Sequence, residues 1–557
     1  MINFYKQFCE EGFDENNCLN SFSIHCADNF NFGYDVVDKI ASEEPAKLAM
    51  QWCNKAGDKR TFTFEDISKL SNKAANVFLS HGIKKGDRVM LILKRHYEYW
   101  YIINALHKIG AVVIPATNML TVKDMIYRIK AADIKAVVCT NEGNVASFLS
   151  EAQSACPDIL KEMFIVRESR DGFYNISEEI EKAPDTLQRI ETNINDPFII
   201  YFTSGTTGEP KAVIHNYTYP LAHIVTAKHW HNVKEGGLHL TVAETGWGKA
   251  SWGKIYGQWL CGSAVMVYDF DKFVADDLID VIRKYKVTTF CAPPTIYRFL
   301  IRTHLTAEDF ASVEYVTTAG EALNYEVYRI FLEKTGKSIM EGFGQTETTL
   351  VLANLVNSVN RPGSMGRPSP LYKTALVDEN DEIIEDTRTG ELVILKPDDS
   401  QQIGLFSGYI DDDEQYKFVW RNGMYHTGDT MHRDEDGYLW YVGRRDDIIK
   451  SSGYRIGPFE IESVLMEHPS VMEVAVTALP SEIRGQVVKA TITLNKGYEG
   501  TEELKRELQD YVKKETAPYK YPRIIEFVPS LPKTISGKIQ REMIRRADAE
   551  KYSSADI

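Results

Sequence analysis

The sequence predicts an α/β protein with a large N-terminal domain, residues 1–445, and a small, mobile α+β C-terminal domain, residues 446–557. Three observations support this fold class. With 557 residues, 43% of them hydrophobic, the chain can bury more than one core. From about residue 60, helix-like and strand-like segments alternate, which is typical of parallel-rich sheets wrapped by helices. Near residue 446 a short polar joint separates this pattern from a compact α+β pattern.

The first alternating run predicts helices at 64–81, 97–108 and 123–132, with strands at 88–93, 111–115 and 136–140. The pattern resumes with strands at 198–202, 264–268, 288–291 and 315–319 and a helix at 275–285. Ligands of such sheets gather at the carboxyl ends of the strands, so the loops that follow these strands are candidate sites.

The polar joint is Arg444-Arg445-Asp446-Asp447, and its composition predicts a hinge at Asp446. After it we expect a helix at 459–466, strands at 472–477 and 487–494, a charged helix at 502–514 and a strand at 524–528. These elements are enough for a small domain.

Composition narrows the class of protein. The net charge of -15 argues against nucleic-acid binding and against attraction to an anionic membrane surface. No apolar run is long enough to span a bilayer, and the first residues resemble neither a secretory signal nor a transit peptide, so a soluble cytoplasmic protein is expected. Eight cysteines without metal-ligand spacing are expected to be reduced thiols. The oligomeric state stays open, a homo-oligomer included.

Basic residues are concentrated near the C-terminus. Between residues 511 and 546 there are nine lysines and arginines against three glutamates. This stretch is either a solvated face or a site for an anionic ligand.

A candidate phosphate-binding loop follows the predicted strand at 198–202. Its residues are Thr203, Ser204, Gly205, Thr206, Thr207, Gly208, Glu209, Pro210 and Lys211. The glycines let the backbone approach a ligand, the hydroxyl groups donate hydrogen bonds, and the lysine adds positive charge. The loop differs from the common P-loop, because Pro210 precedes the lysine and Ala212 follows it. A polyphosphate ligand is therefore expected, with a Ser/Thr/Gly-rich surface turn as the alternative.

Five further motifs follow in order, at residues 341–347, 425–429, 443–447, 452–457 and 532–538. Together with the loop at 203–211 they resemble the motifs of the adenylate-forming acyl-CoA synthetases, over residues 35–546. Residues 457–460 and 517–523 are similar to the medium-chain acyl-CoA synthetases, including an archaeal type.

This resemblance implies a two-step reaction with a small carboxylate, ATP and CoA as partners and Mg²⁺ as cofactor. The carboxylate attacks the α-phosphate of ATP to give acyl-adenylate and pyrophosphate, and CoA then displaces AMP. Lys538 would be the adenylation lysine, Thr346 would bond a phosphate or acyl oxygen, and Glu347 would hold the metal. Outside such a motif, Lys538 would more often be a solvated surface charge.

The resemblance also implies a nucleotide site. Besides the loop at 203–211 and Lys538, its members would be Gly320, Glu321, Ala322, Glu341, Gly342, Phe343, Gly344, Gln345, Thr346, Asp429, Arg444 and Arg455. Phe343 would offer a flat face to adenine. Asp429 and Arg444 would contact the ribose, and Arg455 would meet the adenylate phosphate. Taken alone, Phe343 would be a packed aromatic and Asp429 a turn residue.

For the second step, rotation about Asp446 is implied, together with a set of residues that contact CoA. Ser452, Gly453 and Tyr454 would line the pantetheine path, and Arg484, Lys513, Tyr521 and Arg523 resemble further contacts. Each of these side chains could equally be an ordinary surface group.

Acetate-specific members of the family carry a tryptophan where this chain has Gly344, which implies a pocket deeper than acetate needs. Its other walls would be Trp230, Trp247, Lys249, Trp252 and Cys291, although such aromatics could simply pack the core. Several tryptophans in a small space disfavour long straight chains. A short-chain, medium-chain or branched aliphatic acid is therefore expected, with broad selectivity, since one methylene changes binding by only about 1–3 kcal/mol.

Several other functions fit parts of this pattern. An aromatic-acid (benzoate-like) CoA ligase is the nearest rival. A peptide-synthetase adenylation unit or a luciferase-like oxygenase would share the nucleotide site, but the residues expected to contact CoA, and a chain that ends at Ile557 with no carrier domain, favour thioester formation. A non-catalytic nucleotide-binding homologue would be expected to lack Lys538 or Glu347, and both are present.

Overall fold

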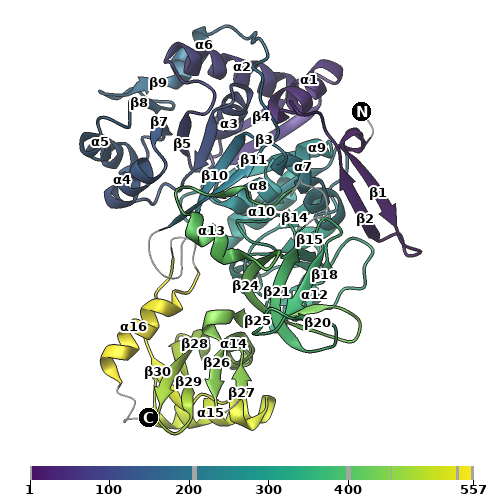
Figure 1. The fold of residues 1–557 in the computed structure, drawn as a ribbon, viewed down its shortest axis with the longest axis vertical. Coiled ribbons are helices and arrows are strands. Elements are labelled where there is room, and N and C mark those ends of the chain that lie inside the picture. The colour runs from purple at the N-terminus through teal and green to yellow at the C-terminus, as the bar shows by residue number, and fades with distance from the viewer. Residues whose placement is uncertain (1–2, 204–209, 397–402, 453, 535–537, 553–557) are drawn as a thin grey trace.

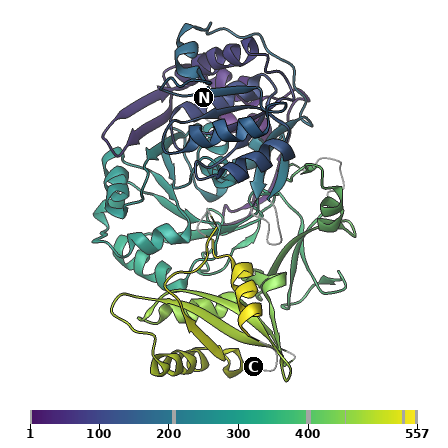
Figure 2. The ribbon, with the colours of Figure 1, turned by 90° about the vertical axis from the view of Figure 1, so that its left-hand side faces the viewer.

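The computed structural model describes residues 3–203, 210–396, 403–452, 454–534 and 538–552 (Figure 1). Two large, mostly parallel sheets and one antiparallel sheet build the N-terminal part, and a small sheet with its own helices builds the C-terminal part. The small part lies at one end of the molecule in both views (Figures 1 and 2). The α/β fold class with a large N-terminal and a small C-terminal domain is confirmed.

The first large sheet has 8 strands. In spatial order they are β22 (Gly408–Tyr409), β11 (Lys211–Asn216), β10 (Pro197–Thr203), β6 (Val112–Pro115), β5 (Arg88–Ile92), β7 (Ile134–Cys139), β8 (Glu162–Ile165) and β9 (Tyr174–Asn175). The strands from β10 to β9 run parallel, whereas β11 and β22 run antiparallel to their neighbours. The connection from β10 to β11 contains the candidate phosphate-binding loop.

Helices cover both faces of this sheet. Along β5, Val89 and Leu91 share a core with α2 (Phe64–Ser80) and α3 (Glu98–Lys108). Met90 and Ile92 point the other way and share a core with α4 (Val122–Ala131) and α5 (Val145–Ala155). Because successive side chains of a strand point to opposite faces, a strand covered on both sides must be apolar throughout. This explains the continuous apolar runs in the sequence.

The second large sheet has 9 strands and is parallel at its centre. In order they are β18 (Arg367–Pro368), β17 (Leu352–Ala353), β16 (Ile339–Phe343), β15 (Tyr315–Thr318), β14 (Thr289–Cys291), β12 (Leu238–Thr241), β13 (Ala264–Asp269), β3 (Leu48–Asn54) and β4 (Lys59–Thr63). The associated helices are α7 (Tyr219–Ile224), α8 (Gly248–Gly253), α9 (Tyr256–Leu260), α10 (Ala275–Tyr285), α11 (Pro294–Leu300) and α12 (Tyr325–Thr335). Residues after β15 and within β16 contribute to the candidate site.

The third sheet is antiparallel and was not predicted from the sequence. Its strands are β20 (Ile383–Ile384), β19 (Thr374–Val377), β21 (Thr389–Leu395), β24 (Met424–Arg433) and β23 (Trp420–Arg421), with β25 (Leu439–Arg444) paired to β24. The short helix α13 (Asp413–Val419) precedes β23. This sheet carries Asp429 and Arg444 on neighbouring strands.

The C-terminal part begins after the short turn η5 (Arg445–Asp447). Its sheet contains β27 (Tyr454–Ile456), β26 (Ile449–Ser451), β29 (Gly485–Leu494) and β28 (Val471–Ser481), with β30 (Ile524–Phe527) paired to β29. Its helical elements are α14 (Pro458–Glu467), α15 (Glu502–Glu515), the turn η6 (Pro518–Lys520) and α16 (Arg541–Lys551). The five elements predicted for this part from the sequence are confirmed.

The N-terminal residues form η1 (Phe4–Phe8), the hairpin β1 (Cys9–Phe13) and β2 (Leu19–Ile24), then η2 (Gly33–Asp38), α1 (Lys39–Glu43). The hairpin projects from the large part in Figure 1. All eight cysteines are unpaired, as expected. Among the described residues, no helix combines the length and the apolar character needed to cross a membrane.

Candidate active site

Asp429 lies at the centre of a polar cluster between β24 and β25. Gln345 Nε2 donates a hydrogen bond to its Oδ2 at 2.5 Å, and Arg444 Nη1 lies 3.3 Å from the same oxygen. Asp429 and Arg444 are direct partners across the two strands, so strand register fixes the contact. Burial raises the pKa of the Asp429 carboxyl, and the positive charge of Arg444 opposes that rise. The two residues expected to contact the ribose are therefore brought together.

Glu347 is partly buried and contacts Tyr409, near the last residue of the candidate phosphate-binding loop. Tyr409 Oη donates to Glu347 Oε1 at 3.0 Å, and Lys211 Nζ lies 5.9 Å from the centre of the Tyr409 ring. Burial raises the pKa of Glu347, and Tyr409, Arg444 and Lys211 act in the opposite direction. Thr203 pairs with Lys211, where β10 ends and β11 begins. Ser204 to Glu209 lie outside the described residues.

The expected adenine site is formed by residues after β15 and at the end of β16. Ala322 and Phe343 are partly buried and pack against the same apolar cluster, and Gly320 has a φ of 105°, which favours glycine. Glu321 forms an ion pair with Arg298 at 3.2 Å.

Glu341 faces backbone rather than an open site. Its carboxyl oxygens accept hydrogen bonds from Leu323 N at 3.2 Å and from Gly363 N at 2.7 Å. Burial raises the pKa of Glu341 to about 8. Glu341 thus holds the backbone at Leu323, the residue that follows Ala322.

Lys538 lies on the connection from β30 to α16 in the small domain. The described residues on either side of 535–537, between β30 and α16, extend toward the large domain in both views (Figures 1 and 2). The main chain there is braced by hydrogen bonds from Thr534 N to Lys538 O at 2.7 Å and from Lys538 N to Thr534 Oγ1 at 3.1 Å. Burial raises the pKa of Asp429, and the positive charge of Lys538 opposes that rise. For Lys249, burial lowers the pKa of the amine, and the charge of Lys538 acts in the same direction. The Lys538 side chain is exposed.

Four of the six expected acyl-pocket residues lie close together. Trp230 and Trp252 form an edge-to-face pair with ring centres 6.3 Å apart, and both share a core with Cys291. A Cβ atom on Gly344 would lie 2.5 Å from Trp252 Cη2 and 2.2 Å from Thr349 O. The indole of Trp252 therefore packs directly on the Gly344 backbone and occupies part of the space that the missing side chain leaves.

Lys249 lies next to the cluster of Trp230, Trp252 and Cys291, whereas Trp247 lies outside that cluster. Lys249 Nζ donates to Ala319 O at 2.5 Å, and burial lowers the pKa of this amine, with Cys291 nearby. Trp247 is half-buried at the start of α8, outside the core shared by Trp230 and Trp252.

The residues expected to contact CoA form two groups on the small domain. In one, Lys513 Nζ lies 4.4 Å from the Tyr521 ring centre, and Arg523 Nη1 donates to Tyr521 Oη at 2.7 Å. In the other, Ser452 N donates to Arg484 O at 3.0 Å, and Arg484 Nη1 donates to Ser452 Oγ at 3.2 Å. Tyr454 continues the second group along β27. Gly453 lies outside the described residues.

Arg455 is not in the nucleotide cluster in this domain arrangement. It forms an ion pair with Glu379, in the turn between β19 and β20 of the large domain, and Lys450 Nζ lies 3.9 Å from the same carboxylate. Asn324 Nδ2 donates to Ser463 O at 3.0 Å across the same interface. These contacts join the small domain to the large one.

Most of the basic C-terminal residues are neutralised by neighbours. Seven of the nine pair with carboxylates: Lys513, Lys514, Lys520, Lys533, Arg541, Arg545 and Arg546. Within the described ranges, Arg523 and Lys538 have no carboxylate partner. Two of the nine basic residues are therefore left without a neutralising carboxylate in the described part of the chain: Arg523, in the expected CoA site, and Lys538, in the expected nucleotide site.

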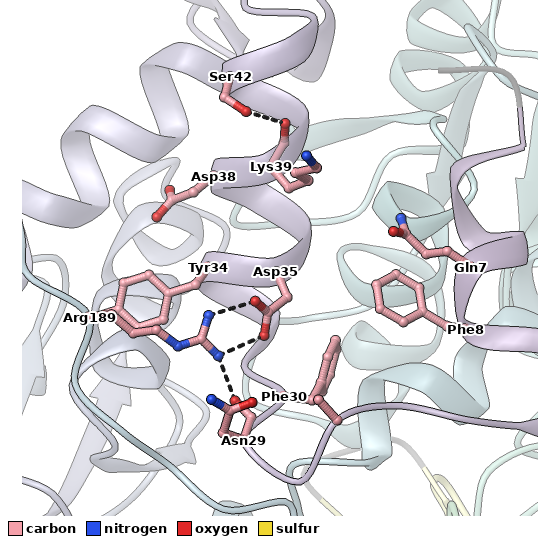
Figure 3. Close-up of a pocket in the computed structure, with 11 residues that line it drawn as sticks. Gln7, Phe8, Asn29, Phe30, Tyr34, Asp35, Asp38, Lys39, Ser42 and Arg189 are labelled. Atoms are coloured by element: carbon pink, nitrogen blue, oxygen red, sulfur yellow. Dashed lines mark hydrogen bonds and ion pairs between the residues drawn. The ribbon is translucent and has the colours of Figure 1, made fainter.

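A separate cavity of about 650 Å³ lies near the N-terminal segment (Figure 3). None of the expected site residues that the structure describes lines it. Arg189 binds Asp35 through both terminal nitrogens, at 2.6 and 2.9 Å, and Asp38 pairs with Lys108 at 2.6 Å. Since these charges are satisfied internally, the cavity offers little to recognise a charged ligand.

Sequence comparison identifies the family. The model for AMP-binding enzymes matches residues 37–410, and that for the AMP-binding enzyme C-terminal domain matches residues 460–538. The chain belongs to the AMP-binding enzyme family. The mitochondrial acyl-coenzyme A synthetase ACSM4 of Homo sapiens is 40% identical over 527 residues, which cover 93% of this chain and 90% of that protein. The mitochondrial acyl-coenzyme A synthetase ACSM3 of Rattus norvegicus is 38% identical, with coverage of 95% and 92%.

Structural comparison agrees. A crystal structure of an anthranilate CoA ligase in complex with anthranoyl-AMP is similar, with a TM-score of 0.85 and 26% identity over 94% of this chain and 98% of that one. Among AMP-binding enzymes, this chain is thus an acyl-CoA synthetase, as its motifs predict.

The structure also draws attention to residues that the sequence analysis did not single out. Tyr409 contacts Glu347, while Tyr425 Oη donates to Gln345 Oε1 at 2.7 Å. Tyr425 and Asp429 belong to the same motif at 425–429, so the sequence could have indicated that Tyr425 lies near the site. Tyr409 reaches the site through the pairing of β22 with β11, which no local pattern indicates.

Proposed function

We propose that this enzyme activates a carboxylate larger than acetate in two steps. A carboxylate oxygen attacks the α-phosphorus of ATP, and the bond to the bridging oxygen of pyrophosphate breaks. The thiolate of CoA then attacks the acyl carbon, and AMP leaves with the electron pair of the acyl–oxygen bond. Both steps gain most from positioning and from positive charge near the phosphates.

The position of Lys538 carries this proposal. Lys538 lies on the connection from β30 to α16, and its positive charge acts to lower the pKa of Asp429 on the ribose side and of Lys249 on the acyl side. Negative charge develops on the phosphate oxygens during adenylation. A cation placed between the ribose and the carboxylate would stabilise that charge. Lys211 would bind the departing phosphates together with the loop at 203–211.

Glu347 would hold Mg²⁺, which neutralises charge on the phosphates when it is bound. The donor chemistry fits, because Mg²⁺ sites in such enzymes combine one or two carboxylates with substrate phosphates. Tyr409 orients the Glu347 carboxyl by donating to its Oε1. Thr346 lies beside it, and His215 Nε2 donates to the Thr346 carbonyl at 2.7 Å, which supports the backbone there.

For the second step we propose a boundary and hinge at Asp446, so that residues 446–557 rotate as a small domain. Rotation would withdraw Lys538 and present Ser452, Tyr454 and Arg455 to the acyl-adenylate. The separate core of the small domain supports this division.

We propose a short-chain, medium-chain or branched aliphatic acid as substrate, because Trp252 narrows the space beside Gly344. An aromatic acid is the second candidate, supported by the similarity to the anthranilate CoA ligase. The cytoplasm is the proposed location, although the two named relatives are mitochondrial.

Pyrophosphate release, measured with and without CoA over a panel of carboxylates, tests the proposal. We expect carboxylate-dependent release, with butyrate or 2-methylbutyrate preferred over benzoate. Absence of such release for every acid would overturn the adenylation reaction. A preference for benzoate would overturn the aliphatic substrate and favour the aromatic one.

A further inference from the structure

Two tyrosines of the small domain stack on each other beside the residues expected to contact CoA. The rings of Tyr454 and Tyr519 have centroids 4.0 Å apart and planes inclined by 16°. Both are partly exposed, 51% for Tyr454 and 39% for Tyr519. Because exposed aromatic side chains gain little from burial, their stacking is the main restraint on the two rings.

Tyr454 needs such a restraint. It begins β27, which is the edge strand of the small-domain sheet, and it follows a turn in which Ser452 has a φ of 48°. This edge strand pairs on one side only, with β26, where Tyr454 is opposite Ser451, and an edge strand next to a strained turn opens more easily than a central one. The position of Tyr454 is therefore weakly determined by the backbone alone.

Tyr519, in contrast, lies on a well-anchored turn. Lys520, its neighbour in η6, binds both carboxyl oxygens of Glu460 on α14 at 2.6 and 2.7 Å. Gln509 of α15 donates to Pro522 O and Arg523 O at 3.0 and 3.1 Å just beyond. The same turn leads directly to Tyr521 and Arg523.

Tyr519 thus joins the two groups of residues expected to contact CoA. On one side its ring holds Tyr454 and, through it, the turn that carries Ser452. On the other side its turn fixes Tyr521 and Arg523. We propose that Tyr519 is a positioning residue for the CoA-dependent step, where it holds the Tyr454 strand at the spacing that the pantetheine and nucleotide portions of CoA require. This inference rests on the proposed function.

The test compares Tyr519→Ala, Tyr519→Phe and the exposed control Tyr498→Ala in the full-length enzyme. Tyr498 is 45% exposed and lies between β29 and α15, away from η6 in sequence. Adenylation is measured as carboxylate-dependent pyrophosphate release without CoA. The second step is measured as acyl-CoA formation from supplied acyl-adenylate, with the KM for CoA determined separately from kcat.

We expect Tyr519→Ala to raise the KM for CoA by roughly 3- to 10-fold, the range expected for loss of one aromatic pair, while adenylation changes less than twofold. Tyr519→Phe keeps the ring and should restore the KM, and the control should leave it unchanged. A double-mutant cycle with Tyr454→Ala should show that the two effects are not additive.

An unchanged KM in Tyr519→Ala, or an equal loss in both steps, would overturn the role. Should Tyr519→Ala fail to fold, Tyr519→Leu, which removes the aromatic ring but keeps an apolar side chain, takes its place, and a normal KM for CoA in Tyr519→Leu would overturn the role instead. Failure of the proposed function is distinguishable, because the unaltered enzyme would then form no acyl-CoA from any acyl-adenylate.

Discussion

Replacement of Trp252 by alanine should extend the acyl chain that the enzyme accepts. The indole is 93% buried, since only 7% of the residue is exposed, and its Cη2 would lie 2.5 Å from a Cβ on Gly344. It therefore fills the space beside the glycine of the motif at 341–347. Removing it opens room next to the expected acyl site without altering the nucleotide contacts at Asp429 or Glu347.

The size of the effect follows from the space released. An indole occupies roughly the volume of three or more methylenes, and each buried methylene contributes about 0.8 kcal/mol. Three additional methylenes would gain about 2.4 kcal/mol, so the ratio of kcat/KM for heptanoate over butyrate should rise by up to about 60-fold. Partial collapse of the cavity reduces this gain, and we expect at least a tenfold rise. The variant should also lose about 3–5 kcal/mol of stability.

The assay is kcat/KM for butyrate, pentanoate, hexanoate and heptanoate, determined below the melting temperature of the variant. Trp440→Ala is the matched control, because Trp440 is half-buried in the antiparallel sheet and donates through Nε1 to Asp434 at 2.9 Å. It should lower activity equally for all chain lengths, if at all. A Trp252→Ala enzyme with an unchanged heptanoate-to-butyrate ratio would refute the placement of the acyl chain against this indole.

Three further predictions concern carboxylates. Glu341→Gln should remove a pH dependence of stability: the folded pKa of about 8 exceeds the unfolded value of 4.5, so the stabilising contribution is complete below pH 4.5 and is lost as the pH rises through 8. Melting temperatures between pH 5 and 9 test this, and an identical slope in both proteins would contradict it. Glu347→Gln should reduce adenylation by about 100-fold or more and raise the Mg²⁺ concentration needed for half-maximal rate; an unaltered Mg²⁺ dependence would exclude Glu347 as a ligand. Glu379→Ala removes the partner of Arg455 across the domain interface. This exposed ion pair contributes up to about 1 kcal/mol. Its loss should shift the ratio of adenylation to CoA transfer by up to about 5-fold in favour of transfer. An unchanged ratio would show that this pair does not influence domain orientation.

The two parallel sheets and the small domain could be predicted because their patterns are local. Apolar strands such as Arg88–Ile92 are bounded by turns, and helices such as Phe64–Ser80 begin at a capping residue, here Thr63, whose side chain accepts from Asp66 N. The antiparallel sheet at 374–444 escaped prediction, since two of its six strands, β20 and β23, have only two residues and others pair with strands far along the chain, as β21 does with β24.

In the candidate site, too, residues within local motifs could be predicted, whereas contacts between distant segments could not. Asp429 and Arg444 lie in recognisable motifs, and the structure brings them to 3.3 Å. The contact of Tyr409 with Glu347 depends on strand pairing between β22 and β11, and the packing of Trp252 on Gly344 depends on how α8 meets the end of β16. Such contacts are set by tertiary packing, and no spacing in the sequence reports them.

The separate measurement of the two half-reactions in Lys538→Ala tests the central claim most directly. The positive charge of this residue acts to lower the pKa of both Asp429 and Lys249. We predict that pyrophosphate release falls by about 100-fold or more, as expected for loss of a group that stabilises developing charge, while acyl-CoA formation from supplied acyl-adenylate stays within about threefold of the unaltered enzyme. Equal losses in both half-reactions, or no loss of pyrophosphate release, would contradict the assignment of Lys538 to adenylation.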